Sequence, residues 1–159
     1  MTDPSDGMKS FQKELRRGGI TVQVAKTDPN LFVHRDAPNG PPELRFTYVR
    51  LKGKTVTAIA IFAAEPPIDG KPSFAVGYAV PKAFQKQGRA KDVLAAAIAD
   101  MQAGLSRNGF PDFYIEAIVG AGNVASRKIA EQVISDEPEA ITEGLSGLPA
   151  FRYVRRITS

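Results

Sequence analysis

Large and small side chains alternate over residues 73–80, where the large ones are Phe74, Val76, Tyr78 and Val80. This period of two, ended by Pro81, predicts a strand. The face between them holds only small residues, namely Ser73, Ala75, Gly77 and Ala79. A strand face without bulk indicates that another group approaches it closely.

After a polar turn at residues 82–89, apolar residues recur at helical spacing: Ala90, Val93, Leu94, Ala97, Ile98, Met101 and Leu105. They form one continuous stripe, which predicts a helix that begins near Gly88 and packs on the sheet. A second strand-like run follows at residues 113–119, and a second helix is predicted to run from Asn123 to Val133.

The flanking segments predict more of the same sheet. Before residue 73 we expect first a helix at 8–17 and a strand at 20–24. A proline-rich loop is predicted at 27–42, with an apolar anchor or short strand at 31–33. A hairpin of two strands, 44–51 and 55–64, follows, and the second strand is predicted to stop at 65–67. After residue 133 we expect a strand or extension at 139–145 and a final strand at 150–157. Residues 1–7 are predicted to be disordered.

Composition limits the classes of function. The 159 residues suit a single domain over 1–159, and 43% hydrophobic with 24% charged residues is typical of a globular protein. Without cysteine, and with His34 as the one histidine, thiol nucleophiles and Cys or His metal clusters are excluded, so no metal is expected. No leader-like or membrane-length apolar run is visible, so we expect a cytoplasmic protein with no membrane partner.

Charge favours an anionic ligand over a nucleic acid. The net charge of +4 is mild, and acidic residues separate the basic ones, so no nucleic-acid partner is expected. The turn before the predicted helix at Gly88 is different, because Lys82, Lys86, Arg89 and Lys91 gather there. The first amides of a helix have no partner within it, and a glycine leaves them accessible to a phosphate or pyrophosphate. The alternative is an ordinary turn with a glycine for geometry and lysines for solubility.

Two motifs in order strengthen the ligand hypothesis. Val80 is followed by Gln85-Lys86-Gln87-Gly88-Arg89-Ala90, and the strand at 113–119 is followed by Asn123-Val124-Ala125-Ser126. Together they resemble the acetyl-coenzyme A motif and the next strand and helix of the GNAT N-acetyltransferase superfamily. The resemblance covers residues 73–133.

The resemblance implies a fold, a cosubstrate and a site. The fold would be α/β, a single mixed, mostly antiparallel sheet with helices on both faces and a central strand pair, 75–80 and 113–119, that splays apart. Acetyl-CoA would be the cosubstrate. Its binding residues would be Ala79, Val80, Gln85, Lys86, Gln87, Gly88, Arg89, Ala90, Asn123 and Ser126. For Asn123 the competing interpretation is a plain helix N-cap.

The catalytic residues are less defined. Where many relatives carry a tyrosine that serves as general acid, this chain has Ala130, so the resemblance makes Ser126 the candidate acid. The base is sought among carboxylates at the strands, either Glu116, placed among apolar residues, or Glu65. Each of these residues has a purely structural alternative. Lys86 also departs from the motif, since many relatives have glycine there.

The resemblance implies transfer of an acetyl group to a primary amine in a direct ternary complex, and the acceptor, a small molecule or a protein, stays open. The alternative is a catalytically weak or inactive coenzyme A-binding sensor or interaction module, because the tyrosine is missing and the loop at 27–42 is short. Family domains usually carry helices between their first two strands, and the helix at 8–17 precedes or belongs to that region. Many relatives are dimers, and the final strand, with Phe151, Tyr153 and Val154, is a candidate edge for a homodimer.

Overall fold

The structure is a computed structural model that describes residues 4–41 and 43–158. Its elements, in chain order, are α1 (Pro4–Arg17), β1 (Gln23–Val24), β2 (Phe32–Asp36), β3 (Arg45–Lys52), β4 (Thr55–Ile68), β5 (Lys71–Ala79), the 3₁₀ turn η1 (Lys82–Phe84), α2 (Arg89–Arg107), β6 (Phe113–Gly120), α3 (Val124–Val133), β7 (Glu139–Thr142) and β8 (Pro149–Ile157). The strands form one sheet in the order β1-β2-β3-β4-β5-β6-β8-β7. All neighbours are antiparallel except β5 and β6, which are parallel. The predicted mixed, mostly antiparallel sheet is confirmed.

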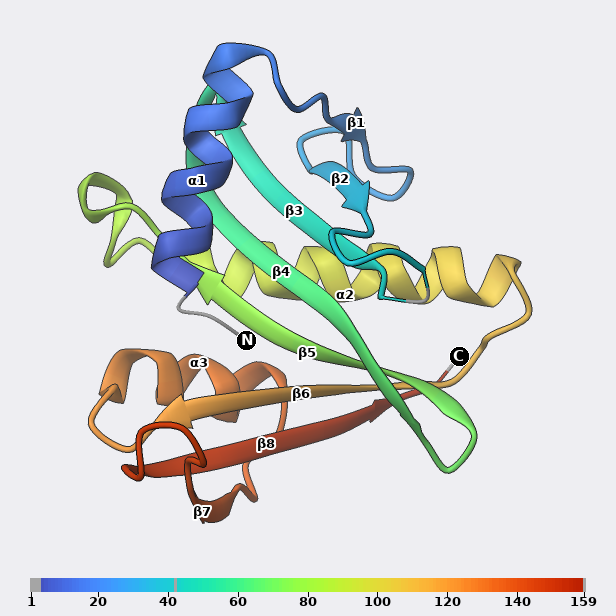
Figure 1. Cartoon of the computed structure of the whole chain (residues 1–159). Coiled ribbons are helices and arrows are strands. Elements are labelled where there is room, and N and C mark those ends of the chain that lie inside the picture. Colours follow the sequence, from blue (N-terminus) through green and yellow to red (C-terminus); the bar gives the residue numbers. More distant parts are fainter. Residues whose placement is uncertain (1–3, 42, 159) are drawn as a thin grey trace.

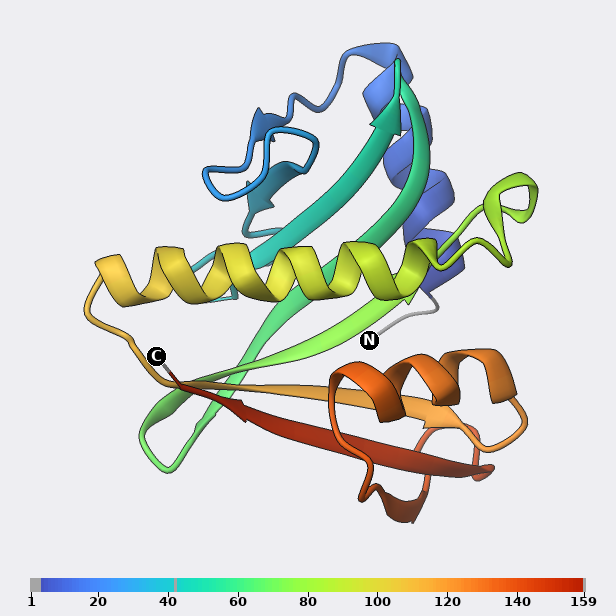
Figure 2. The same cartoon turned by 180° about the vertical axis from the view of Figure 1, so that it is seen from behind.

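Helices cover both faces of the sheet, as predicted. Helix α1 lies across β4 and the end of β5 (Figure 1), and its apolar stripe of Met8, Phe11 and Leu15 packs on Val49, Val56 and Ile59. Helices α2 and α3 lie on the opposite face (Figure 2). There the larger core joins α2 and α3 to the large-residue face of β5, so the alternation at 73–80 has the predicted orientation. Burial of apolar surface on both faces holds the layers together.

The central strand pair splays apart. Strands β5 and β6 are paired only at Ser73 with Tyr114, Phe74 with Ile115, and Ala75 with Glu116. Beyond Ala75 the edge of β5 that faces β6 has no ladder partner among the described residues, although β5 stays paired with β4 as far as Ala79. The gap therefore begins at Ala75 and Glu116 and widens toward the N-termini of α2 and α3, where both strands end.

Several predicted boundaries are wrong. Helix α1 begins at Pro4, so residues 4–7 are helical rather than disordered; residues 1–3 lie outside the described part. Proline suits the first turn of a helix, and a Cβ at Gly7 would come within 3.1 Å of Ile61 Cδ1, so glycine allows α1 its close approach to β4. The sequence at 65–67 does not stop β4, which continues through a register shift to Ile68.

The edges of the sheet also differ from expectation. The predicted strand at 20–24 is only two residues long, and the anchor at 31–33 belongs to β2, which pairs with β3. The final strand β8 is an edge only in part, because β7 pairs with its first residues, Pro149–Arg152, on the side away from β6. From Tyr153 to Ile157 no described strand pairs with β8 on that side, so a homodimer through this part of β8 stays a prediction. Helix α1 precedes every described strand, which answers the open question about its position.

Candidate active site

The turn between β5 and α2 is built on two left-handed residues. Gly88 has φ of 72°, and an added Cβ would meet no atom within 4 Å, so the glycine serves both the backbone geometry and an open approach. Lys86 also has a positive φ, 62°, which is strained for a residue with a side chain. This explains in physical terms why a glycine suits the position that Lys86 holds.

The N-terminus of α2 has no side-chain cap. The first intrahelical hydrogen bond runs from the Asp92 amide to the Gly88 carbonyl at 3.1 Å, so the preceding amides have no partner within the helix. Asp92 would oppose an anion there, but Arg50 binds its carboxylate at 3.0 Å. Lys82, Lys86 and Lys91, all exposed, leave the charge around this turn positive.

Two contacts shape the rest of the turn. The side chain of Gln85 donates to the Val80 carbonyl at 3.0 Å, which fixes the turn to the end of β5. Arg89 donates to Gln87 at 2.9 Å, and its guanidinium lies 5.1 Å from the centre of the Phe84 ring. The predicted loop residues 85–90 are thus brought together around one helix terminus.

In the turn between β6 and α3, side chains of the turn itself make hydrogen bonds to its backbone. Asn123 caps α3, because its Oδ1 accepts from the Ser126 amide at 3.2 Å. Arg127 donates to the Ala121 carbonyl at 3.0 Å and stacks on Phe151, with 4.3 Å from the guanidinium to the ring centre. The N-cap interpretation of Asn123 is confirmed, and its contact with a ligand stays a prediction.

Tyr78 joins the two sides of the splay. Its hydroxyl donates to the Ser126 carbonyl at 2.7 Å, which links β5 to the first turn of α3. Burial raises the pKa of the Tyr78 phenol, so it stays protonated as a donor at neutral pH. Ser126 therefore lies beside the splay on the α2 and α3 face.

The candidate bases lie on the opposite face. Glu116 pairs with Ala75, and its Oε2 accepts from Nε and Nη2 of Arg152 at 2.9 and 2.7 Å. Glu65 is exposed and, among the described residues, has no ion-pair partner. Partial desolvation first, and the Glu116 charge second, raise the pKa of Glu65.

The structure thus separates the predicted catalytic residues by the thickness of the sheet. Ser126 approaches the splay from one face, while Glu116 stands on the other face at the last paired position. On that second face α1 covers β4 and the end of β5 but does not extend over β6 and β8 (Figure 1). Ile118 of β6 is accordingly 49% exposed. Glu65, opposite Ser73 on β4, and Glu116, opposite Ala75 on β6, lie at the closed end of the splay.

Two residues and one hydrogen bond that organise this region were not predicted from the sequence. Arg152, which binds Glu116, lies 36 residues from it and has no local signal beyond its place in an alternating strand. Arg127 follows Ser126 directly, so the signal that could have identified it is a cation next to the Asn-x-x-Ser motif. The bond from Tyr78 to Ser126 joins residues that are 48 apart, and only a superposed family pattern would bring them together.

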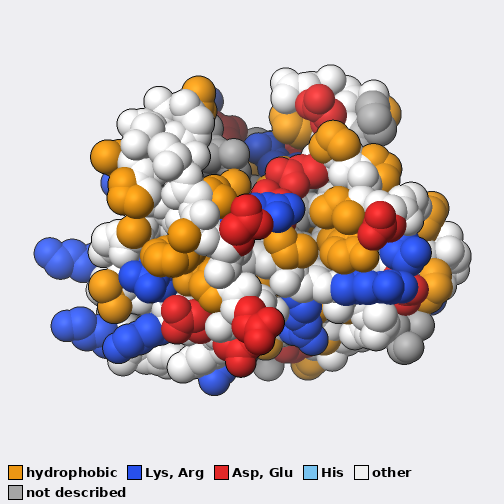
Figure 3. All heavy atoms as spheres, turned by 90° about the horizontal axis from the view of Figure 1, so that it is seen from below, with side chains coloured by type: hydrophobic (Ala, Val, Ile, Leu, Met, Phe, Trp, Pro, Cys, Tyr) orange, Lys and Arg blue, Asp and Glu red, His pale blue; other side chains and the backbone are white. Residues whose placement is uncertain are grey.

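The described residues were also compared with a metal site, a membrane-spanning helix and a nucleic-acid surface. In the described ranges 4–41 and 43–158, no three acidic, histidine or cysteine side chains gather as metal ligands. None of the described helices has the length and apolar sequence needed to cross a bilayer. The face seen from the side of β7 and β8 mixes acidic and basic side chains (Figure 3), unlike the single-sign surface of a nucleic-acid footprint.

Comparison with known proteins identifies the fold. No model of a protein family and no curated protein matches the sequence. Among solved structures, a GNAT-family acetyltransferase from Streptococcus pneumoniae matches over 98% of this chain and 96% of its own, with a TM-score of 0.57 and 13% identity. The NatC complex bound to Gag peptide and CoA matches over 70% and 71%, with a TM-score of 0.52 and 18% identity.

A third solved structure is the ribosomal L7/L12 alpha-N-protein acetyltransferase RimL in complex with coenzyme A. It has a TM-score of 0.50 and 21% identity, and the match spans 71% of this chain but only 62% of that one. At these identities the likeness defines the fold. The chain has the GNAT fold, the architecture of the acetyl-CoA-dependent N-acetyltransferases, as the motif resemblance predicts.

Proposed function

We propose that this protein is an acetyl-CoA-dependent N-acetyltransferase that acts on a primary amine. The observation that carries the proposal is the splay between β5 and β6, which opens onto the uncapped N-terminus of α2. An unpaired strand edge offers amides and carbonyls to an extended, amide-containing molecule. An uncapped helix N-terminus offers amides to a diphosphate.

The chain's residues fit both parts of coenzyme A. The open Gly88 turn and the amides of the first turn of α2 suit the pyrophosphate, with Lys82, Lys86 and Arg89 near it. The free edge of β5 from Val76 to Ala79 suits the pantetheine arm, and Asn123 and Ser126 line the far side. When bound, the thioester would supply the acetyl group.

Proton transfer requires a base for the amine and an acid for the leaving sulfur. Ser126 is the proposed acid, since Tyr78 holds its backbone beside the splay. As base, Glu65 has an advantage over Glu116, whose Oε2 already accepts two hydrogen bonds from Arg152. A raised pKa moves the Glu65 carboxylate toward working pH, where a general base is most effective. We retain both, with Glu65 acting directly or through water.

The sequence lacks cysteine, so a thiol acyl-enzyme is excluded and direct transfer within a ternary complex is the proposed route. The acceptor amine, on a protein or a small molecule, is not defined by these residues. Localisation in the cytoplasm and a homodimer remain expectations.

The test is acetyl transfer itself. Purified protein is mixed with acetyl-CoA and a panel of primary amines that includes peptide N-termini, lysine side chains and polyamines, and release of free thiol is followed. We expect thiol release with at least one amine, with a rate that rises as pH increases through the Glu65 pKa. Glu65→Gln would abolish this pH dependence, whereas Glu116→Gln would not if Glu65 is the base.

A second candidate is a coenzyme A-binding module without turnover. The observation in its favour is Ala130, fully buried in α3 at the position of the family's tyrosine. Binding of acetyl-CoA without thiol release for any amine in the panel would favour this candidate. Absence of binding would remove both.

A further inference from the structure

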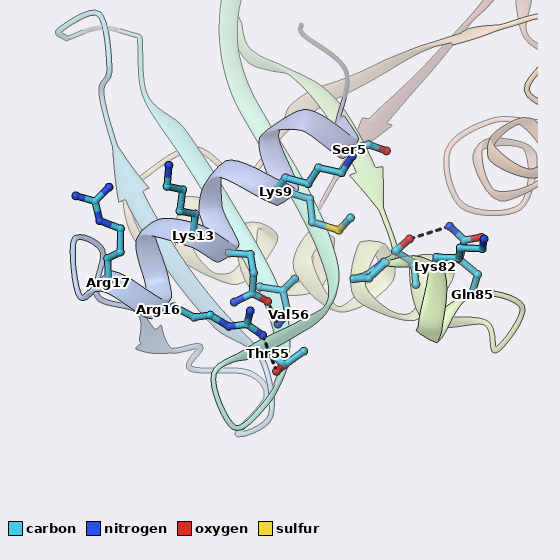
Figure 4. Close-up of a pocket in the computed structure, with 13 residues that line it drawn as sticks. Ser5, Lys9, Lys13, Arg16, Arg17, Thr55, Val56, Lys82 and Gln85 are labelled. Atoms are coloured by element: carbon cyan, nitrogen blue, oxygen red, sulfur yellow. Dashed lines mark hydrogen bonds between the residues drawn. The ribbon is translucent and has the colours of Figure 1, made fainter.

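A cavity of about 850 Å³ lies between α1, the start of β4 and the segment that leaves β5. Figure 4 shows α1 on one side of it and the segment with Lys82 and Gln85 on the other. It adjoins the proposed cofactor turn, because Val80 and Gln85 belong to both. The proposed function leaves the α1 side of this cavity without a role.

The lining of the cavity carries charge of one sign. Among the described residues that line it, five side chains are cationic and none is a carboxylate; the cations are Lys9, Lys13, Arg16, Arg17 and Lys82. Four of them project from successive turns of α1 at spacings of three and four residues, so they share one face of the helix (Figure 4). On the face drawn in Figure 3, by contrast, acidic and basic side chains are mixed.

Few of these cations are neutralised within the protein. Arg17 makes an exposed pair with Glu14 at 3.4 Å, and Arg16 donates to the Thr55 hydroxyl at 3.3 Å. Among the described residues, Lys9, Lys13 and Lys82 take part in no ion pair. Like charges three or four residues apart repel one another and destabilise a helix, so a bound anion would reduce this repulsion and stabilise α1.

The floor of the cavity distinguishes between anionic partners. It is apolar, with Met8, Val56 and Val80, and none of the described residues that line the cavity is aromatic. Single-stranded nucleic acids depend on aromatic platforms for stacking, which are missing here. A polypeptide that alternates acidic and aliphatic side chains matches both the cationic wall and the apolar floor.

We propose that the groove between α1 and the β5–α2 turn docks an acidic, aliphatic-containing segment of a protein partner. The docking does not require acetyl transfer. If the proposed function holds, however, the groove also selects the substrate class, because a segment seated on α1 ends beside Val80, at the mouth of the splay. The preferred acceptors would then be proteins with an acidic segment near the reactive amine.

The test is fluorescence anisotropy with a labelled short peptide in which glutamate and leucine alternate. The matched peptide has glutamine in place of glutamate. The groove variant is Lys9→Glu with Lys13→Glu, and the matched control is Lys52→Glu with Lys128→Glu, two exposed lysines outside the cavity with the same change in net charge. Circular dichroism checks that both variants keep the wild-type fold.

We expect the wild type to bind the acidic peptide and not the glutamine peptide, with affinity that falls as salt rises. The groove variant should lose affinity roughly tenfold or more, and the control less than about twofold. Equal loss in both variants, no binding by the wild type, or stronger binding of oligouridine than of the peptide would overturn the proposal.

A separate titration with coenzyme A distinguishes this proposal from the proposed function. If the groove variant loses coenzyme A affinity as strongly as it loses peptide, the cations serve the nucleotide and the docking proposal is wrong. If the wild type binds the peptide but no coenzyme A, the docking proposal stands and the acetyltransferase proposal fails.

Discussion

The two turns at the open end of the splay differ in how their helix N-termini are satisfied. At α3 the Asn123 side chain caps the Ser126 amide, and Arg127 holds the turn from the other side. At α2 the cap position is Gly88, which offers no side chain, and the space in front of it is open. At α3 the amides of Val124 and Ser126 are bonded within the protein, whereas at α2 the first bonded amide is that of Asp92, so the amides before it are left for an anion.

This difference indicates that the two motif turns have different roles. A cap residue that already binds its own helix contributes mainly to stability, whereas an uncapped, cation-lined terminus contributes mainly to ligand affinity. Substitutions in the two turns should therefore affect different measurements.

The largest effect is expected at Gly88. Gly88→Glu places a negative charge at the open terminus and should weaken coenzyme A binding on the order of 100-fold, about 2.7 kcal/mol, in calorimetric titration. Gly88→Asn is the control, because asparagine tolerates the left-handed backbone, is neutral and has room for its Cβ. It should retain affinity within about threefold. Equal loss in both variants would mean that backbone geometry, not charge, decides.

Asn123→Ala tests the closed turn. Loss of the bond to the Ser126 amide should lower the free energy of unfolding by about 1 kcal/mol, measured by urea denaturation. Asn123→Ser keeps a capping oxygen and should stay near the wild type. Unchanged stability in the alanine variant would contradict the claim that the Asn123 cap contributes mainly to stability.

Tyr78→Phe tests the link between the strand of the open turn and the helix of the closed one. The Ser126 carbonyl would lose its 2.7 Å bond, and stability should fall by about 1 kcal/mol with faster amide exchange in α3. Tyr114→Phe is the same chemical change on a half-buried tyrosine that donates no hydrogen bond to the described residues. If amide exchange in α3 is the same in both variants, the hydrogen bond from Tyr78 to Ser126 does not stabilise α3.

The smallest effect is expected at Lys86. Lys86→Gly relieves the positive φ and should stabilise the protein by about 0.5 kcal/mol, because the cost of a left-handed side chain exceeds the extra entropy of glycine in the unfolded chain. Lys86→Ala removes the charge but keeps the strain, so thermal denaturation should show no gain. A gain in both variants would assign the effect to charge.

Sequence alone predicted the parts of the fold whose signals are local. The alternation at 73–80, the helical stripe after Gly88 and the hairpin at 44–64 depend on neighbouring residues, and each has the predicted form. The motif turns were also found, because a glycine before a helix and an asparagine at a cap are local features.

The rest depends on contacts between distant residues. The ion pair of Glu116 with Arg152 and the raised pKa of Glu65 follow from strand order and register, which no local pattern contains. The close approach of α1 to β4 at Gly7, where a Cβ would lie 3.1 Å from Ile61 Cδ1, is likewise a contact between distant residues. The position of β7 beside the first part of β8 depends on the pairing of two late strands.

The most direct test of the central claim follows the backbone amides of the labelled protein by NMR during titration with coenzyme A. The amides of Arg89 and Ala90, at the open terminus of α2, should shift furthest downfield, because they would donate to a charged oxygen. The Ser126 amide, already bonded to Asn123, should shift much less. If Ser126 shifts as far as Arg89, or if the α2 amides do not move while coenzyme A binds, then the open turn is not the anion site.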